Sequence, residues 1–453
     1  MRLKLMTLIL ISILASCSGD TWKLITADKS KLRAAGEGYV YGLPLVIMDG
    51  TRIAMTDPRN AGSVPINTFR HQKTFPDANF TAVVRPAVDF LYSTAMLDLS
   101  AGPIELNLPS FSDRYYMMPI LDAYTNVIAT PSSRNPNEFK QRLILVGPDH
   151  SAPEGDEASI IRSPTNLAWA IGRIAATAGD DQLLAAETQS QISLIAENDL
   201  VDIPSVQRIT KPKDWVSNMS AEEFFYRLSV SMAANPPATN DDEIIGKLEA
   251  INFVPGEPYI LSEQSEEIQE VVALGVKVAR ERLQEHITDL VDSTDADWRF
   301  PPDNLGRYGV DYNTRALVAL VGLGANLQED AVYPSASRDS EGRLLDGAHS
   351  YRLHFPEGTL PPARALWSIT VYGSDGFLQS TATSKYKLGS MDSLVLNADG
   401  SVDLFFGGNP PEGRESNWLP ANPGEMVLTM RLYWPEQAVL NGSWNIPRLE
   451  RLN

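Results

Sequence analysis

The side chains best suited to chemistry fall between residues 85 and 122 of the chain. They are Arg85, Asp89, Tyr92, Asp98, Arg114 and Asp122. Mixed charges of this kind could form a polar cluster that binds sugar hydroxyls or a carboxylate. The same residue types also form structural salt bridges and cap strand ends, so both interpretations stay open.

Histidine is the usual partner for such groups in acid–base catalysis, and the five histidines are scattered. They are His71, His150, His286, His349 and His354. None belongs to a metal-ligand motif, so a metal site has weak support and no cofactor is expected. His71 lies just upstream of the polar stretch and is the best candidate for a general base. Asp89, Tyr92 and Arg114 complete the candidate catalytic set.

Motifs of other common enzyme classes are missing from the sequence. Ser390 lacks the second glycine of a nucleophile elbow, and the Gly322–Gly324 pair lacks the rest of a dinucleotide fingerprint. The acidic segment 339–347 falls short of the EF-hand pattern, and a turn between strands explains it more simply.

Aromatic residues gather in the C-terminal part of the chain. They are Trp367, Tyr372, Trp418, Tyr433, Trp434 and Trp444. Aromatic faces bind sugar rings and apolar molecules, which makes Trp367 and Trp418 candidate ligand-binding residues. Packing in a hydrophobic core is the alternative role for these tryptophans.

The N-terminus reads as a lipoprotein signal covering residues 1–17. Arg2 and Lys4 precede an apolar run too short to remain as a membrane span, and the run leads to Cys17. We expect cleavage before Cys17 and its acylation, so that lipid anchors the protein to a membrane. An ordinary cleaved signal is the alternative. Because no aspartate follows the cysteine, the expected location is the outer membrane of the bacterial envelope.

Composition narrows the range of partners. The 453 residues carry a formal net charge of −19, which argues against a nucleic-acid partner. The same charge disfavours adsorption to anionic lipid, leaving the acyl chains as the membrane contact. Cys17 is the only cysteine, so no disulfide is available. The chain is long enough for two or three domains, and its oligomeric state stays open.

The pattern of hydrophobic residues predicts a mainly β protein with a helical middle part. Short strand-like runs divided by turn residues indicate an N-terminal β-sandwich domain over residues 26–165, after a short polar helix near 26–36. Helical periodicity follows over residues 166–297, most clearly from Ile268 to Ile287, and Ser220 has the spacing of a helix cap. Strand patterns return over residues 298–453, where Asp375-Gly376 and Asp399-Gly400 indicate hairpin turns in a jelly-roll-like domain.

Two sets of motifs resemble a pair of bacterial families. Segments 84–93, 97–100, 113–116 and 121–126 resemble the domain of unknown function 1254. Segments 315–316, 330–334, 367–372, 399–401 and 417–420 are similar to its usual companion, domain of unknown function 1214. The resemblance implies an N-terminal β-sandwich, a small helical part and a C-terminal jelly roll. It places Tyr124 beside Asp122 in a family motif but implies no settled activity.

One departure from the family pattern touches the candidate site. Family members usually carry Asn and Thr where this chain has Ala87 and Phe90, on either side of Asp89. Two polar groups are thus replaced by apolar ones, which implies a different ligand or chemistry if this motif lines a site.

These observations favour a lipid-anchored envelope protein that binds a small molecule or glycan in a cleft between its β domains. Arg85, Asp98, Asp122 and Tyr124 would contribute to binding. A hydrolase or lyase acting on a carbohydrate or ester, with His71 and Asp89 transferring protons, is one alternative. A structural or assembly lipoprotein without a small ligand is the other.

Overall fold

The computed structural model describes residues 27–452, apart from residues 82, 112, 156, 197–206, 293–297 and 382. Cys17 and the apolar run before it therefore lie outside the described residues. Within the described part, none of the helices combines the length and the apolar character needed to cross a bilayer.

The described chain begins with a long helix, α3 (Lys29–Thr56), instead of the short polar helix expected near residues 26–36. Asp28 caps it by accepting hydrogen bonds from the backbone amides of Ser30 and Lys31. The helix continues through Pro44, and the apolar stretch from Tyr41 to Met48 is almost completely buried. A helix that is apolar on all sides needs neighbours on all sides, and α3 has them.

Five helices pack around α3: α5 (Pro212–Ser217), α6 (Ala221–Ala234), α7 (Asp242–Leu248), α8 (Glu266–Asp292) and α9 (Tyr312–Val321). The backbones of α3 and α8 approach closely, since a Cβ added to Gly275 would lie 2.6 Å from the Cβ of Ala35 and 3.0 Å from the backbone nitrogen of Gly36. The expected apolar face of α8 is confirmed, with Val272 and Val276 fully buried. The expected cap is also present, since the Ser220 hydroxyl accepts the backbone amide of Glu223.

The first β domain is a two-sheet sandwich. One sheet has the order β1 (Arg70–Gln72), β2 (Phe90–Asp98), β9 (Leu167–Ala175), β5 (Ile120–Asp122), β6 (Val127–Ala129), with β4 (Tyr116–Met117) also paired to β9. The other has the order β10 (Ser193–Ala196), β3 (Ile104–Asn107), β7 (Arg142–Val146), β8 (Ser159–Arg162). Apolar residues of β2, β3, β7 and β9 form the core between the sheets. The helix α4 (Asp180–Gln189) packs beside β2 and β9.

This domain extends beyond the boundary expected at residue 165. The strand β9 pairs with β2 along nine residues and with β4 and β5, so the segment expected to open the helical region is the central strand of a sheet. Residues 167–175 are apolar almost throughout, and a short apolar run fits a buried strand as well as a helix.

The C-terminal domain is a second sandwich of jelly-roll type. Its first sheet has the order β11 (Ala331–Val332), β18 (Met426–Pro435), β14 (Ala363–Gly373), β15 (Lys387–Gly389), with β12 (Ser335–Ala336) also paired to β18. Its second sheet has the order β17 (Trp418–Leu419), β16 (Val402–Gly407), β13 (Ser350–Phe355), β19 (Leu449–Arg451). The short helix α10 (Gln437–Leu440) follows β18.

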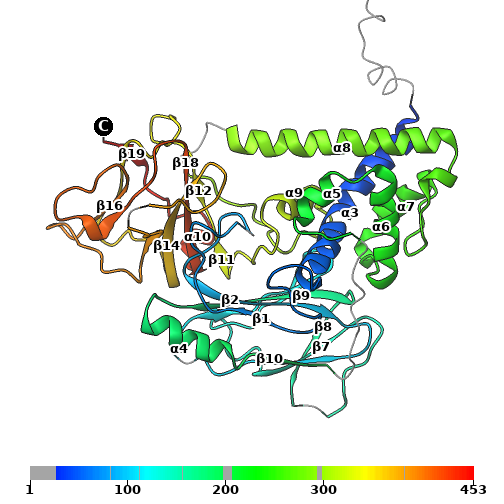
Figure 1. Ribbon diagram of the computed structural model, residues 1–453, viewed down its shortest axis with the longest axis horizontal. Helices are drawn as coiled ribbons and strands as arrows, with labels where there is room; N and C mark the ends of the chain where they lie inside the picture. The colour runs from blue at the N-terminus through cyan, green and yellow to red at the C-terminus, as the bar shows by residue number, and fades with distance from the viewer. Residues whose placement is uncertain are drawn as a thin grey trace, which may run out of the picture.

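Asp375-Gly376 and Asp399-Gly400 form turns, as expected, but neither pair is the two-residue loop of a β-hairpin. Gly376 and Gly400 have positive φ angles of 80° and 82°, as Asp-Gly turns require. The next strand along the chain, however, begins at Lys387 after the first turn, so a longer connection joins β14 to β15. Figure 1 shows the resulting arrangement, in which the C-terminal domain lies beside the first β domain and the helices surround α3.

Candidate functional site

The face of the C-terminal domain that meets the first β domain is polar and buried. Ser368, Thr370 and Tyr372 alternate along β14 with apolar residues that fill the jelly-roll core, and all three are 0% exposed. Arg431 and Tyr433 do the same on the neighbouring strand β18. In a single sandwich the outer face of a sheet would meet water. Here the first β domain covers it.

Asp89 enters this face from the first β domain. It immediately precedes β2 and is 0% exposed. Its Oδ2 accepts a 2.7 Å hydrogen bond from the Ser368 hydroxyl, and its Oδ1 lies 3.6 Å from Nζ of Lys387. The Lys387 amine is also 3.6 Å from Oδ2 of Asp392, so two carboxylates share one ammonium.

Arg431 occupies the middle of the polar face. Its guanidinium donates to the Tyr372 hydroxyl at 2.6 Å, to the Arg85 carbonyl at 2.8 Å and to the Thr370 hydroxyl at 3.1 Å. The Tyr372 hydroxyl in turn donates to the Pro86 carbonyl at 2.7 Å. These bonds hold the segment before Asp89 against β14 and β18.

Arg173 comes from the opposite side of the interface. It lies directly across from Tyr92 in the β2–β9 register, and its guanidinium is 5.3 Å from the centre of the Tyr92 ring. Only 8% of Arg173 is exposed. It donates to Oδ1 of Asn326 at 2.8 Å, and the Asn326 amide donates to the Tyr333 hydroxyl at 2.6 Å.

Tyr333 and Tyr433 lie between the two arginines. The Arg431 guanidinium is 5.8 Å from the centre of the Tyr333 ring, which packs 5.7 Å from the Tyr433 ring. Burial raises the pKa of Tyr433 well above its usual value, so this hydroxyl is a neutral donor. Its Oη makes no hydrogen bond of standard geometry with the described residues. Six residues from the two β domains meet at this interface, and we call them the interdomain cluster: Asp89, Tyr92, Arg173, Tyr333, Arg431 and Tyr433.

Of the candidate catalytic set, Asp89 and Tyr92 belong to this cluster, whereas His71 and Arg114 are placed elsewhere. His71 pairs with Ser93, whose side chain is on the opposite face of β2 from Tyr92, and its Nδ1 is 2.9 Å from the Ser93 hydroxyl. Burial, with a smaller effect of Lys73, lowers the pKa of His71. The expected proton-transfer pair with Asp89 is therefore not formed.

Arg114 has a structural position. Its guanidinium lies 3.0 Å from the Asp181 carboxylate and 2.9 Å from that of Asp113. It also donates to the Ala175 carbonyl at the end of β9, so it ties α4 to the sheet.

Two of the candidate binding residues have local roles. The Arg85 backbone, at a φ of 50°, donates to the Gly376 carbonyl at 2.7 Å and helps to join the two β domains. The Asp98 carboxylate accepts the backbone amide of Ser100 and caps the end of β2.

Asp122 and Tyr124 belong to a second buried cluster, between the first β domain and the helices. The Asp122 carboxylate accepts two hydrogen bonds from Asn126, and burial raises the pKa of Asp122 to about 6. The Tyr124 ring is 5.3 Å from the Arg315 guanidinium, which the rings of Tyr41 and Tyr312 also face, at 5.2 and 5.0 Å.

The hydroxyls of this second cluster meet a buried acid. Tyr41 and Tyr312 each donate to one carboxylate oxygen of Asp241, at 3.0 and 2.9 Å. We call Tyr41, Tyr124, Tyr312 and Arg315 the tyrosine cage. The cage joins α3, α9 and the first β domain. The Arg315 guanidinium already occupies the position facing the three rings that a ligand cation would take.

Both candidate tryptophans have partners within the C-terminal domain. Trp367 is 4% exposed and packs in the jelly-roll core. The Trp418 indole donates to the Gly407 carbonyl at 2.6 Å. Core packing and strand anchoring thus account for these two side chains.

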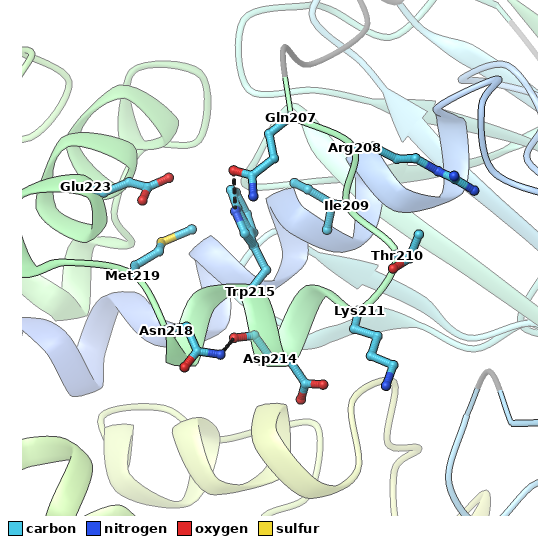
Figure 2. Close-up of a pocket in the computed structure, with 10 residues that line it drawn as sticks. All are labelled: Gln207, Arg208, Ile209, Thr210, Lys211, Asp214, Trp215, Asn218, Met219 and Glu223. Atoms are coloured by element: carbon cyan, nitrogen blue, oxygen red, sulfur yellow. Dashed lines mark hydrogen bonds between the residues drawn. The ribbon is translucent and has the colours of Figure 1, made fainter.

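An open groove with a volume of about 370 Å³ lies beside α5. Figure 2 shows the residues that line it. Its lining includes Trp215, whose indole donates to the Gln207 side chain at 3.2 Å. The Arg227 guanidinium stacks on the Trp215 ring at 4.4 Å. Because the main aromatic face is taken by an arginine of the same chain, this groove is a weaker candidate than the interdomain cluster.

Within the described ranges, no three His, Cys, Asp or Glu side chains come together in a way that could hold a metal ion. Sequence reasoning missed Arg173, Tyr333 and Arg431, and it named Tyr433 only among the C-terminal aromatic residues. A signal for two of them exists, because each arginine interrupts a strand that is otherwise apolar or hydroxyl-bearing. An arginine in such a run requires a buried polar partner or a ligand.

Comparison with known families agrees with this architecture. The family model described as "Protein of unknown function (DUF1254)" matches residues 66–196, and "Protein of unknown function (DUF1214)" matches residues 330–437. The chain belongs to the proteins in which a DUF1254 region precedes a DUF1214 region. In this DUF1254–DUF1214 protein, the interdomain cluster draws residues from both family regions.

Among solved structures, the crystal structure of the VPA0106 protein from Vibrio parahaemolyticus is similar over 93% of this chain and 100% of that one, with a TM-score of 0.71 and 19% identity. This likeness shows the fold. An uncharacterized protein from Burkholderia cenocepacia covers 92% of this chain and 88% of its own, with a TM-score of 0.46 and 11% identity. None of the curated proteins matches the chain.

Proposed function

We propose that this DUF1254–DUF1214 protein is a lipid-anchored envelope protein that binds a small molecule between its two β domains. The observation that carries the binding proposal is the interdomain cluster, where both domains contribute buried polar side chains to one place. Buried polar atoms without a hydrogen bond or an ion pair are costly, and two of them lie here: Nε of Arg173 and Oη of Tyr433. A ligand that supplies the missing partners would offset that cost.

The aromatic members of the cluster differ in their exposure. Tyr92 and Tyr333 are partly exposed, whereas Arg173, Arg431 and Tyr433 behind them are buried. A few polar groups behind an aromatic rim are typical of small-molecule sites at domain interfaces. The enzymatic alternative loses support, because His71 contacts Ser93 of the first β domain whereas Asp89 contacts Ser368 and Lys387 of the C-terminal domain.

The anchor rests on the signal and on Cys17. Together with the expected absence of a nucleic-acid partner, it favours a site that samples small molecules at the bacterial envelope, with the outer membrane as the proposed location.

A thermal-shift screen of the full chain in detergent tests the binding proposal, using sugars, organic acids, phenolics and lipids. A ligand at 100 times its Kd should stabilise the fold by about 2.7 kcal/mol. The proposal expects the shift to shrink in Tyr433→Phe and to persist in Tyr226→Phe, which removes an exposed hydroxyl from α6. Absence of any hit from a well-folded sample would favour the assembly alternative.

A further inference from the structure

The charges of the interdomain cluster and its two flanking residues do not balance. Three cationic side chains, Arg173, Arg431 and Lys387, face two carboxylates, Asp89 and Asp392. Both carboxylates lie at the same ammonium, that of Lys387. The nearest further buried acid of the interface, Asp330, pairs with Arg134 at 2.7 Å. One unit of positive charge is left without a counterion.

The hydrogen bonds of the two arginines support the same conclusion. The hydrogen bonds of Arg173 go to neutral oxygens, of Asn326, Gly324 and Tyr92. The hydrogen bonds of the Arg431 guanidinium also go to neutral oxygens, those of Thr370, Arg85 and Tyr372. Among the described residues, no carboxylate lies within 4.0 Å of either guanidinium. A buried charge without a counterion is strongly unfavourable, so a ligand anion would stabilise this arrangement.

The donors are placed to receive such an anion. Within the described part of the chain, Nε–H of Arg173 has no hydrogen-bond partner, and the Tyr433 hydroxyl makes no hydrogen bond of standard geometry, with the Tyr333 hydroxyl as its neighbour. The two arginines lie on either side of Tyr333, one linked to its hydroxyl through Asn326 and the other facing its ring. Guanidinium and phenol groups are donors that bind carboxylates well.

We propose that the ligand is a small organic acid whose single carboxylate accepts hydrogen bonds from Arg173 and Tyr433, with Arg431 as a second nearby positive charge. This inference rests on the proposed function and names its ligand class. The replacement of the usual family Asn and Thr by Ala87 and Phe90 fits an acid with an apolar body, since Phe90 packs 4.4 Å from the Tyr433 ring.

Isothermal titration calorimetry on the full chain in detergent tests this assignment. The probes are benzoate, its neutral isostere benzamide, and inorganic phosphate, all at equal ionic strength set with sodium chloride. We expect benzoate to bind at least roughly tenfold more tightly than benzamide, because a hydrogen bond to a charged group contributes more than a neutral one.

Two variants locate the site. Tyr433→Phe removes a hydroxyl that holds no other group and should weaken benzoate binding by about tenfold to a hundredfold. Tyr226→Phe, the matched change at an exposed position, should leave it unchanged. Arg173→Gln should abolish benzoate binding, and the conservative Tyr433→Phe keeps the test valid if Arg173→Gln does not fold.

The possible failures are distinguishable. Equal binding of benzoate and benzamide, with both weakened in Tyr433→Phe, would overturn the acid class and leave the small-molecule site standing. Binding of phosphate without benzoate would overturn the carboxylate assignment. If none of the three probes binds, the acid class falls, and the wider thermal-shift screen then decides the proposed function.

Discussion

Ser368 of the C-terminal domain donates a 2.7 Å hydrogen bond to the carboxylate of Asp89, which the first β domain contributes. Both residues are 0% exposed, and 279 positions separate them along the chain. This contact fixes the two β domains in the orientation that assembles the interdomain cluster. A change at either residue therefore tests whether the interface stabilises the whole fold.

Ser368→Ala should destabilise the protein by about 1–3 kcal/mol, because it leaves a buried carboxylate oxygen without its donor. The measurement is chemical denaturation followed by circular dichroism. A double-mutant cycle with Asp89→Asn should give a coupling energy of at least about 0.5 kcal/mol between the two sites. Strictly additive effects would show that the contact contributes nothing to the interface.

Asp122 predicts a specific pH dependence. Burial raises the pKa of Asp122 in the folded state to about 6, above its ordinary value of 3.8, so the folded state binds the proton more tightly than the unfolded state. The resulting stabilisation is complete below pH 4 and is lost as the pH rises to about 6, a change of about 3 kcal/mol.

The variant Asp122→Asn cannot titrate and should not show this loss. The difference in unfolding free energy between variant and wild type should therefore grow in favour of the variant from pH 4 to pH 6, and then stay constant. Denaturation curves at several pH values measure it. A difference that is flat across this range would contradict the raised pKa.

The tyrosine cage predicts the effect of removing single hydroxyls. Tyr41→Phe keeps the ring over Arg315 but leaves Oδ2 of the buried Asp241 with only the backbone amide of Ala238, at 3.3 Å, as a donor. We expect a loss of about 1.5–3 kcal/mol in the free energy of unfolding. Tyr226→Phe, at an exposed position, should stay within about 0.5 kcal/mol of wild type. Equal stability of the two variants would exclude a structural role for the Tyr41 hydroxyl.

The lipid anchor can be tested in cells. Cys17→Ser should abolish incorporation of labelled palmitate and release the protein from the membrane fraction, since acylation requires the thiol. The full chain is expressed in a bacterium, and the fractions are compared by immunoblot. Ser16→Ala, beside the cysteine, should still be acylated. Labelling that persists in Cys17→Ser would refute the anchor.

Periodicity made several elements predictable from sequence. The helix α8 appears at the expected position, and the regions before residue 165 and after residue 298 contain strands as expected, because these elements present regular apolar faces to a core. The same reasoning could not place β9, since a short apolar run is ambiguous between strand and helix. It also predicted too short a helix at the start of the described chain, because the burial of α3 depends on helices far along the sequence.

The candidate site was only half predictable. Asp89 and Tyr92 stood out by residue type, but Arg431 and Tyr433 lie on a strand face whose alternating pattern matches that of a solvent-exposed face. Only the docking of a second domain turns this face into a buried one. Sequence periodicity describes the two faces of a sheet but does not say what covers them.

The burial of α3 also has a kinetic consequence. This helix is among the first elements to be synthesised, yet Arg315, which binds its Tyr41 ring, is 274 residues further along the chain. At ribosomal rates, on the order of tens of seconds pass before that partner exists. The helices that cover α3 begin only at Pro212, so for most of this time its apolar surface lacks its native helical neighbours. Productive folding of this protein therefore depends on protection of its first helix until those neighbours arrive.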